Sequence, residues 1–242
     1  MSDEQPKFAN VAAFVEDYIG NVYQRQVTDL SDTVWCQEWW RHVEAVARLD
    51  ALWRAWEQLH RDERGGLSHW LLEHADHHMK RLFDPRGPFK YCSVRNGHMD
   101  MIGPLPLKSP PGGLFVDEDD ERPEGWIYRT VVEFVENYLS MIYQRQVTDL
   151  SDTVWCPEWW RHQEAVVRLD ALWRAWEYHR QNPSTGLSMW FLKHADPHMA
   201  QLFDPKGPFK YCNARGGHQS NLSPLPITLP VQGLFTDPED PR

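Results

Sequence analysis

The stretch WCQEWWRHVEAVARLDALWRAWE, residues 35–57, returns as WCPEWWRHQEAVVRLDALWRAWE at residues 155–177. The two stretches start 120 residues apart, and the match extends without a gap from residues 14–115 to residues 134–235, with 66 of 102 positions identical. A repeat of this length is a whole domain rather than the short unit of a solenoid. The sequence therefore predicts a tandem duplication, with a first repeat at 8–116, an acidic linker at 117–126 and a second repeat at 127–236.

Composition narrows the class of protein. The chain has 242 residues, 41% of them apolar, and its 13 tryptophans can build a core within a short segment. No apolar run approaches the roughly 20 residues that span a bilayer, so we expect no membrane association. The polar start MSDEQPKFAN lacks the basic and apolar regions of a signal peptide, which favours a cytoplasmic location. A net charge of −10 disfavours binding to nucleic-acid phosphates without excluding a local basic strip, and makes protein the expected partner.

The apolar periodicity within each repeat is helical. In the first repeat it predicts a helix at about residues 10–25, a second from Gln37 to about Leu59, and a third that follows Gly66. Pro157 stands where the first repeat has Gln37, and proline is favoured at the first position of a helix. At helical spacing one face of the second helix carries an apolar stripe, made of Trp39, His42, Val46, Leu49, Trp53 and Trp56.

The last third of each repeat is predicted to be less regular. Pro197 disfavours helix at Asp196, which predicts a break there and at the equivalent Asp76. Asn96-Gly97 indicates a tight hairpin, and the prolines of PLPLKSPP predict an extended tail packed on its own domain. The predicted fold class is mainly α: two tandem homologous helical domains, each with about three helices, a short β-hairpin and an extended Pro-rich tail.

Six cysteine and histidine positions are retained in both repeats. Four of them form two C-x5-H pairs per repeat, one where the long helix starts and one around the hairpin. Two Cys and two His from two short elements suit a structural zinc ion, one per repeat, and no other cofactor is indicated. The candidate ligands are Cys36, His42, Cys92 and His98, then Cys156, His162, Cys212 and His218, with His74, His78, His194 and His198 as alternatives.

Helical spacing weighs against this zinc site. Six helical residues rotate by about 600°, so Cys36 and His42 would point about 120° apart unless Cys36 lies outside the helix. In the simpler interpretation His42 is a core histidine with Glu38 as its partner, and the cysteines are buried apolar residues. A Cys36–Cys92 disulfide is disfavoured in a reducing compartment. A catalytic Cys36 activated by the helix N-terminus is a further alternative, although no oxyanion hole or phosphate loop is visible around it.

A second ridge on the long helix carries Trp40, with Val43, Ala47 and Ala51 nearby, so this helix is expected to be covered on two sides. Because tryptophan is favoured at interaction hot spots, Trp40 and the equivalent Trp160 are candidate anchors for a protein partner. Burial of both rings between the two repeats is the alternative.

The string WC-x2-WW-x-H-x-EA-x2-RLDALW-x-AWE resembles an uncharacterised family of actinobacteria and their phages and plasmids, catalogued as domain of unknown function 4913. The resemblance continues through G-x-S-x-W, H-x-D-x-H and GPF-x2-C, and covers about 90 residues of each repeat. It implies a phage or mobile-element setting beside replication or conjugation genes, and it supplies no activity. Two fused copies depart from the single domain expected of this family.

Three hypotheses for function follow. The first is a non-enzymatic binding protein of a phage or mobile genetic element, built as an internal pseudo-dimer of one domain. The second is a zinc-stabilised protein that contacts nucleic acid or the replication or conjugation machinery. The third is a cysteine-dependent enzyme, for which the sequence suggests no substrate.

Overall fold

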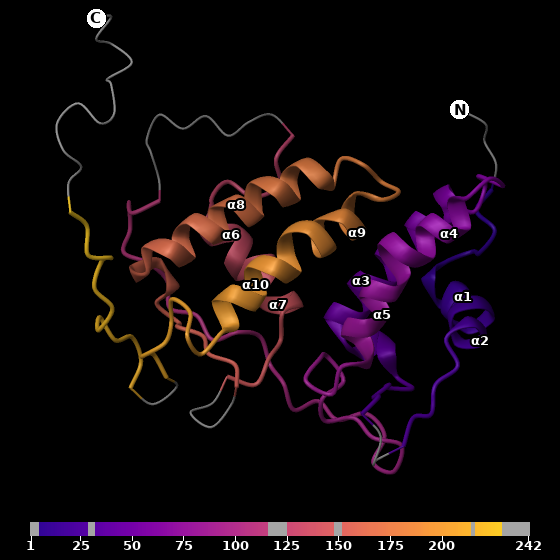
Figure 1. Ribbon diagram of the computed structural model, residues 1–242, viewed down its shortest axis with the longest axis horizontal. Coiled ribbons are helices and arrows are strands. Elements are labelled where there is room, and N and C mark those ends of the chain that lie inside the picture. The colour runs from indigo at the N-terminus through magenta and orange to yellow at the C-terminus, as the bar shows by residue number, and fades with distance from the viewer. Residues whose placement is uncertain (1–4, 29–31, 116–124, 148–151, 214–215, 229–242) are drawn as a thin grey trace, which may run out of the picture.

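The computed structural model describes residues 5–28, 32–115, 125–147, 152–213 and 216–228. It consists of two helical repeats that lie side by side (Figure 1), so the predicted mainly α fold in two tandem domains is confirmed. Of the predicted linker, only Gly125 and Trp126 fall within the described residues, and the Trp126 ring already packs edge-on against Trp173 at 5.0 Å. Within the described part of the chain, no helix is both long and apolar enough to cross a bilayer.

Each repeat contains three helical segments, and the first and third of them include one wide π turn. In the first repeat these are α1 (Val11–Phe14), the π turn Val15–Ile19 and α2 (Gly20–Val22); the 3-10 turn Trp39–Arg41 and α3 (Val43–Leu59); and α4 (Gly66–Trp70), the π turn Leu71–Ala75 and α5 (Asp76–Phe83). The second repeat has α6 (Val131–Phe134), Val135–Leu139 and α7 (Ser140–Ile142); Trp159–Arg161 and α8 (Gln163–His179); and α9 (Gly186–Trp190), Phe191–Ala195 and α10 (Asp196–Phe203).

The long helix starts later than the sequence predicts. It begins at Val43 rather than Gln37, because the 3-10 turn before it ends at His42, whose backbone is extended with φ −107° and ψ 111°. The His42 N–H donates to the Trp39 carbonyl at 3.1 Å, while the His42 carbonyl accepts the first bond of α3. Pro157 likewise lies in the turn before the second long helix, not at its first position. His42 is therefore not part of the apolar stripe, and the helical spacing between Cys36 and His42 does not apply.

The predicted breaks at Asp76 and Asp196 are also wrong, because the third helical segment runs through both positions. Asp196 has φ −60° and ψ −45°, and its N–H reaches five residues back to the carbonyl of Phe191. Proline cannot donate the hydrogen bond of an ordinary helical turn. The widened π turn directly before Pro197 has already changed the bonding register, so the helix accommodates the proline at its next turn.

Tryptophan rings fill the centre of each repeat. Trp70 is wholly buried against Phe14, and its Nε1–H donates to the Leu52 carbonyl at 3.0 Å, which satisfies the polar atom of the ring. The third segment can approach α3 this closely because it starts with a glycine. A Cβ on Gly66 would lie 1.9 Å from the Leu59 carbonyl oxygen, so the glycine of the G-x-S-x-W motif is required by packing.

The two repeats contact each other through different faces. Helix α3 of the first repeat packs on α7 and α9 of the second. Ala51 on α3 is fully buried, whereas the equivalent Ala171 on α8 is exposed. Ser188 on α9 is fully buried, whereas the equivalent Ser68 is exposed. The contact is therefore heterologous, joining unlike surfaces, and not the reciprocal contact of a two-fold pair.

A buried ionic network lies at the centre of this interface. The guanidinium of Arg48, fully buried, donates to both carboxylate oxygens of Asp196 at 2.6 and 3.0 Å and to Glu44 at 2.9 Å. Glu44 in turn accepts from Arg145 at 2.5 Å, and Asp196 accepts from the Tyr143 hydroxyl at 2.7 Å. The guanidinium beside Asp196 holds the pKa of that carboxyl at about 2 against the opposing effect of burial, which would raise it. Each charge is thus paired across the two repeats.

His74 and His78, considered above as alternative zinc ligands, belong to this interface. His74 Nδ1 lies 2.6 Å and His78 Nε2 lies 2.9 Å from the hydroxyl of Ser188. Burial lowers the pKa of His74 to about 4 and lowers that of His78 well below its ordinary value, with the Arg48 charge adding to the effect on His78. Both rings are therefore neutral at pH 7.

The sequence predicts that the tail of the first repeat packs on its own domain, and this prediction is wrong. The tail crosses to the second repeat and runs beneath it (Figure 1). Leu105 is buried in the second core, and the Trp155 ring donates to the carbonyl of Pro106 at 3.0 Å. Burial of Leu105 and hydrogen bonds to the backbone of the tail stabilise it in this position.

Replacing Arg48 by Met should destabilise the protein by about 3–5 kcal/mol, because Asp196 and Glu44 would remain buried without their cation. The matched change Arg168→Met, on the equivalent but partly exposed arginine, should alter stability by no more than about 0.5 kcal/mol. Urea unfolding of both variants measures the difference. Equal losses in the two variants would contradict the role given to Arg48.

Acid should weaken the contact between the repeats. The folded-state pKa of His74 is about 4 and that of His78 lies well below the ordinary 6.5, so their contribution is complete above about pH 6.5 and is lost progressively as the pH falls below that value. Each histidine contributes a slope of about 1.4 kcal/mol per pH unit in that range. His74→Asn and His78→Asn should therefore flatten the pH dependence of the free energy of unfolding relative to wild type. Parallel curves would refute this assignment.

Candidate metal centre

Four side chains converge at the start of the long helix in the first repeat. They are Cys36, His42, Cys92 and His98, and their four nearest ligand atoms all lie within 4.8 Å of one another. Cys36 Sγ lies 3.6 Å and Cys92 Sγ lies 3.9 Å from His98 Nδ1. His42 Nε2 lies 3.4 Å from Cys92 Sγ and 3.0 Å from His98 Nδ1.

The second repeat builds the same group from Cys156, His162, Cys212 and His218. Here His162 Nε2 lies 3.4 Å from Cys212 Sγ and 2.9 Å from His218 Nδ1, and Cys156 Sγ lies 3.8 Å from His218 Nδ1. Two groups with closely similar geometry therefore occur, one in each repeat.

These separations match the edges of a tetrahedral zinc site. With Zn–S bonds of about 2.3 Å and Zn–N bonds of about 2.05 Å, a tetrahedron places two nitrogens about 3.3 Å apart and a nitrogen and a sulfur about 3.6 Å apart. The nitrogen–sulfur separations given above are 3.4 to 3.9 Å, the nitrogen–nitrogen separations are 2.9 and 3.0 Å, and every other pair of ligand atoms lies within 4.8 Å. The donor set and its shape can hold one divalent cation in each repeat.

Local backbone structure explains why the ligands meet. Cys36 precedes the 3-10 turn and His42 follows it, so neither is held in helical register. Cys92 and His98 flank a tight turn that is closed by an antiparallel bridge between Ser93 and Gly97. Gly97 has φ of 71°, a conformation that glycine adopts without strain, and Gly217 repeats it at 66°. The predicted hairpin is thus present as one bridge, and its position brings its two ligands to the other pair.

Outer contacts orient the ligands. The Met99 N–H points at Cys92 Sγ from 3.5 Å, and the Gln219 N–H points at Cys212 Sγ from 3.4 Å. The carbonyl of Pro88 accepts a hydrogen bond from the His42 ring, whose Nε2 faces the cluster. Backbone donors to thiolates and carbonyl acceptors for the second histidine nitrogen are the usual outer partners of metal ligands.

Burial shapes the electrostatics of the group. It lowers the pKa of His42 to about 4, with the nearby His98 as the next cause, and it raises the pKa of Cys36 to about 12, with Cys92 as the next cause. Neutral histidine is the metal-binding form, whereas a thiol must lose its proton to bind, which a divalent cation promotes. An activated cysteine nucleophile needs a lowered pKa, and the direction at Cys36 is the opposite.

The structure also places the remaining candidates. All four cysteines are free thiols, so the Cys36–Cys92 disulfide is absent. The alternative ligands lie outside the two groups: His74 and His78 face Ser188, while His194 contacts His179 and His198 contacts Arg168. The core interpretation was correct about burial of the cysteines, because Cys36 and Cys92 are also members of the first hydrophobic core. Its predicted Glu38 partner for His42 is wrong, because Glu38 pairs with Arg41 at 3.1 Å.

Trp40 and Trp160 occupy unequal environments. Trp40 is 59% exposed, whereas Trp160 packs against the second core and its Nε1–H donates to the carbonyl of Lys108 at 3.2 Å. Trp160 therefore contacts the tail of the first repeat, and Trp40 keeps its ring at the surface.

The sequence model of one family matches the chain twice, at residues 8–111 and 128–231. The chain belongs to the DUF4913 family. This family is described as a domain of unknown function, and each match includes the four cysteine and histidine positions of one group. No curated protein and no solved structure is similar to the chain. The chain thus contains two DUF4913 domains in tandem. The chemistry of the site has to be inferred from the arrangement of its cysteine and histidine side chains.

Cys36→Ser should leave about one zinc ion per chain instead of two, and Cys156→Ser should do the same, because each removes a ligand from one repeat only. The double variant should hold none. His69→Gln serves as a control, since His69 is exposed and outside both groups. Elemental analysis of the purified proteins measures zinc directly. Full zinc content in the double variant would exclude these ligands.

Proposed function

We propose that each repeat binds one structural zinc ion, and that the chain is a non-enzymatic binding protein built from two such modules. The observation that carries the proposal is the convergence of two thiols and two imidazoles in each repeat, all within 4.8 Å. Four protein ligands complete a tetrahedral site and leave no position for a substrate or a reactive water, which is the mark of a structural rather than a catalytic zinc.

The zinc ion would fasten an otherwise weakly held segment. Residues 84–100 contain turns and one bridge, and a hairpin this short is marginal by itself in water. The cation would join Cys92 and His98 of this segment to Cys36 and His42 at the start of α3. The order of the segment would then depend on the metal, because a bound structural zinc contributes directly to folding.

The binding role rests on the exposed surface. Trp40 is a large exposed ring beside the metal group, a residue type that forms hot spots in protein interfaces. The net charge of −10 favours a protein partner over nucleic acid. The proposal includes a phage or mobile-element setting and contact with replication or conjugation machinery, both of which rest on the family resemblance. It also includes a cytoplasmic location, which rests on the reduced cysteines.

Removing zinc with a chelator should lower the melting temperature and expose residues 84–100 to protease, because the apo thiols and imidazoles no longer tie this segment to α3. Most of the helical circular dichroism signal should remain, since the packing that joins the helices, such as Trp70 against Phe14, does not depend on the cysteine and histidine side chains. Readdition of zinc should restore both properties. Identical melting and proteolysis with and without metal would contradict the proposed function.

A further inference from the structure

The tail of the first repeat occupies a groove on the second repeat through main-chain recognition. Leu105, 3% exposed, inserts into the second core, and its N–H donates to the carbonyl of Ser140 at 3.1 Å. The carbonyl of the next residue, Pro106, accepts from the Trp155 ring at 3.0 Å. The segment is thus held by one apolar anchor and by hydrogen bonds to its backbone.

The same mode continues along the tail. The Lys108 N–H donates to the carbonyl of Pro157 at 2.9 Å, and the Lys108 carbonyl accepts from Trp160 Nε1–H at 3.2 Å. The ammonium of Lys108 adds an ion pair with Glu158 at 2.8 Å. Phe115, farther along, packs on Trp159 with ring centroids 5.6 Å apart.

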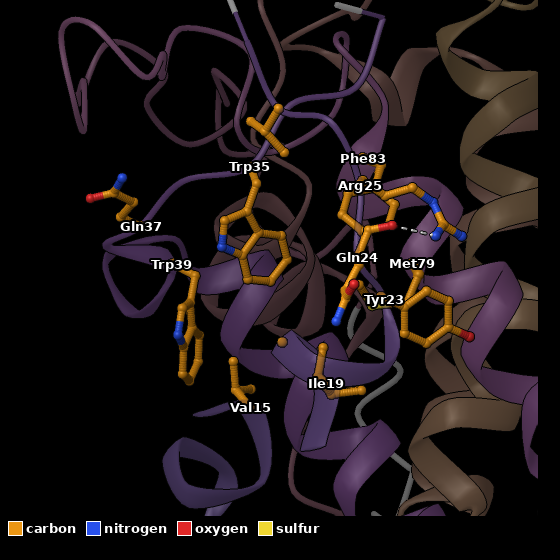
Figure 2. Close-up of a pocket in the computed structure, with 12 residues that line it drawn as sticks. Val15, Ile19, Tyr23, Gln24, Arg25, Trp35, Gln37, Trp39, Met79 and Phe83 are labelled. Atoms are coloured by element: carbon orange, nitrogen blue, oxygen red, sulfur yellow. Dashed lines mark hydrogen bonds between the residues drawn. The ribbon is translucent and has the colours of Figure 1, made fainter. Parts of the chain in front are cut away.

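The equivalent groove on the first repeat is open. It has a volume of about 520 Å³, and its lining includes the counterparts of the residues that hold the tail in the second repeat (Figure 2). Gly20, Trp35 and Gln37 stand where the second repeat has Ser140, Trp155 and Pro157; Trp39 and Met79 also line it. Trp40, the counterpart of Trp160, is exposed beside them.

The chain also carries a second copy of the ligand for this groove. Residues 224–228 read PLPIT, the counterpart of PLPLK at residues 104–108. Leu225 is 83% exposed and Ile227 is 81% exposed, although the equivalent Leu105 is buried and Leu107 packs on the second core. A free ligand and a free site of matching type therefore occur at opposite repeats of one molecule.

The ionic network supplies an independent second pair of matching surfaces. Arg168 and Glu164 form the same intrahelical pair at 2.8 Å that Arg48 and Glu44 form, but their side chains are 27% and 51% exposed. On the first repeat the Tyr23 hydroxyl donates to the exposed Asp76 at 2.8 Å, as Tyr143 does to the buried Asp196. A counterpart of each half of the buried ionic network is therefore present at the surface. The second repeat carries the Arg168–Glu164 pair, and the first repeat carries the Tyr23–Asp76 pair.

The matching extends to a pair of equivalent positions. Lys193 of the second repeat lies 3.8 Å from Glu73 of the first at the internal interface. Residues 73 and 193 are equivalent positions of the two repeats. A contact between two copies of the chain would therefore again place Lys193 of one copy near Glu73 of the other. Arg25 holds the Gln24 carbonyl at 2.9 Å, as Arg145 holds that of Gln144, and would face Glu164.

We infer that copies of this chain associate head to tail. Residues 224–228 and the Arg168 face of one copy dock on the groove and the Asp76 face of the first repeat of the next copy. The contact reproduces the internal interface between the two repeats. A heterologous interface of this kind leaves one free end of each type, so it propagates to a ring or a filament.

Direction argues for a second copy rather than for the chain's own groove. Inside the molecule the first repeat offers both its tail and its Arg48 face toward the second repeat. The second repeat therefore offers its own tail and Arg168 face farther along the same direction, away from the first. In Figure 1 the yellow segment 216–228 lies at the end of the molecule opposite to α2, and Gly20 of α2 lines the open groove.

Light scattering coupled to size exclusion, over a series of concentrations of the full zinc-loaded chain, tests the inference. The wild type should exceed the single-chain mass of 28.5 kDa increasingly with concentration. Leu225→Asp should weaken association at least about tenfold, because the anchor that enters the core would carry a charge. Asn137→Ser, at an exposed side chain whose hydrogen bond stays within its own helix, should leave association unchanged.

A charge exchange makes the test specific. Arg168→Asp and Asp76→Arg should each weaken association, and the two changes in one chain should restore it, because each new interface regains an opposite pair. A mass of one chain at every concentration, or association that Leu225→Asp leaves intact, would overturn the inference. The inference builds on the protein-binding role of the Trp40 surface and not on the metal, so its failure would leave the zinc proposal standing.

Discussion

The extended backbone of one residue in each repeat, His42 or His162, is the constraint on which the rest depends. It ends the 3-10 turn, starts the long helix one residue later and turns the imidazole out of helical register. From this position the ring meets the cysteine that precedes the same 3-10 turn, and a cysteine and a second histidine that come from a distant segment. After this residue, one side of the long helix packs on the core of its own repeat. In the first repeat, another side of the same helix packs on the second repeat.

The two repeats show what one sequence pattern does in different surroundings. Arg48 and Arg168 each pair with the glutamate one turn earlier, but only Arg48 is enclosed by the neighbouring domain and bound to Asp196. The duplication thus produces one satisfied interface and leaves its two halves uncovered at the ends. A gene duplication that fuses two copies of a head-to-tail assembling domain would give this arrangement, because fusion converts one contact between chains into a contact within a chain.

Sequence reasoning recovered the duplication and the helical class, because these depend on periodicity and on residue type, and it named the eight Cys and His positions that the structure groups in two clusters. It placed the helix start near Gln37 because Pro157 stands at the equivalent position and proline is favoured at the first position of a helix, and no local propensity marks the extended residue. It expected a break at Asp196 because a π turn that accommodates Pro197 has no composition signal. The crossing of the tail to the other repeat is a tertiary choice between two grooves of nearly identical sequence, which local patterns cannot distinguish.

The central claim is that two thiolates and two imidazoles surround one zinc ion in each repeat. X-ray absorption at the zinc edge of the purified protein measures the ligand shell without any substitution. The account predicts an average of two sulfur atoms at about 2.3 Å and two nitrogen atoms at about 2.0 Å per zinc, with no bound water. A shell of oxygen and nitrogen atoms, or of a single sulfur atom, would contradict it.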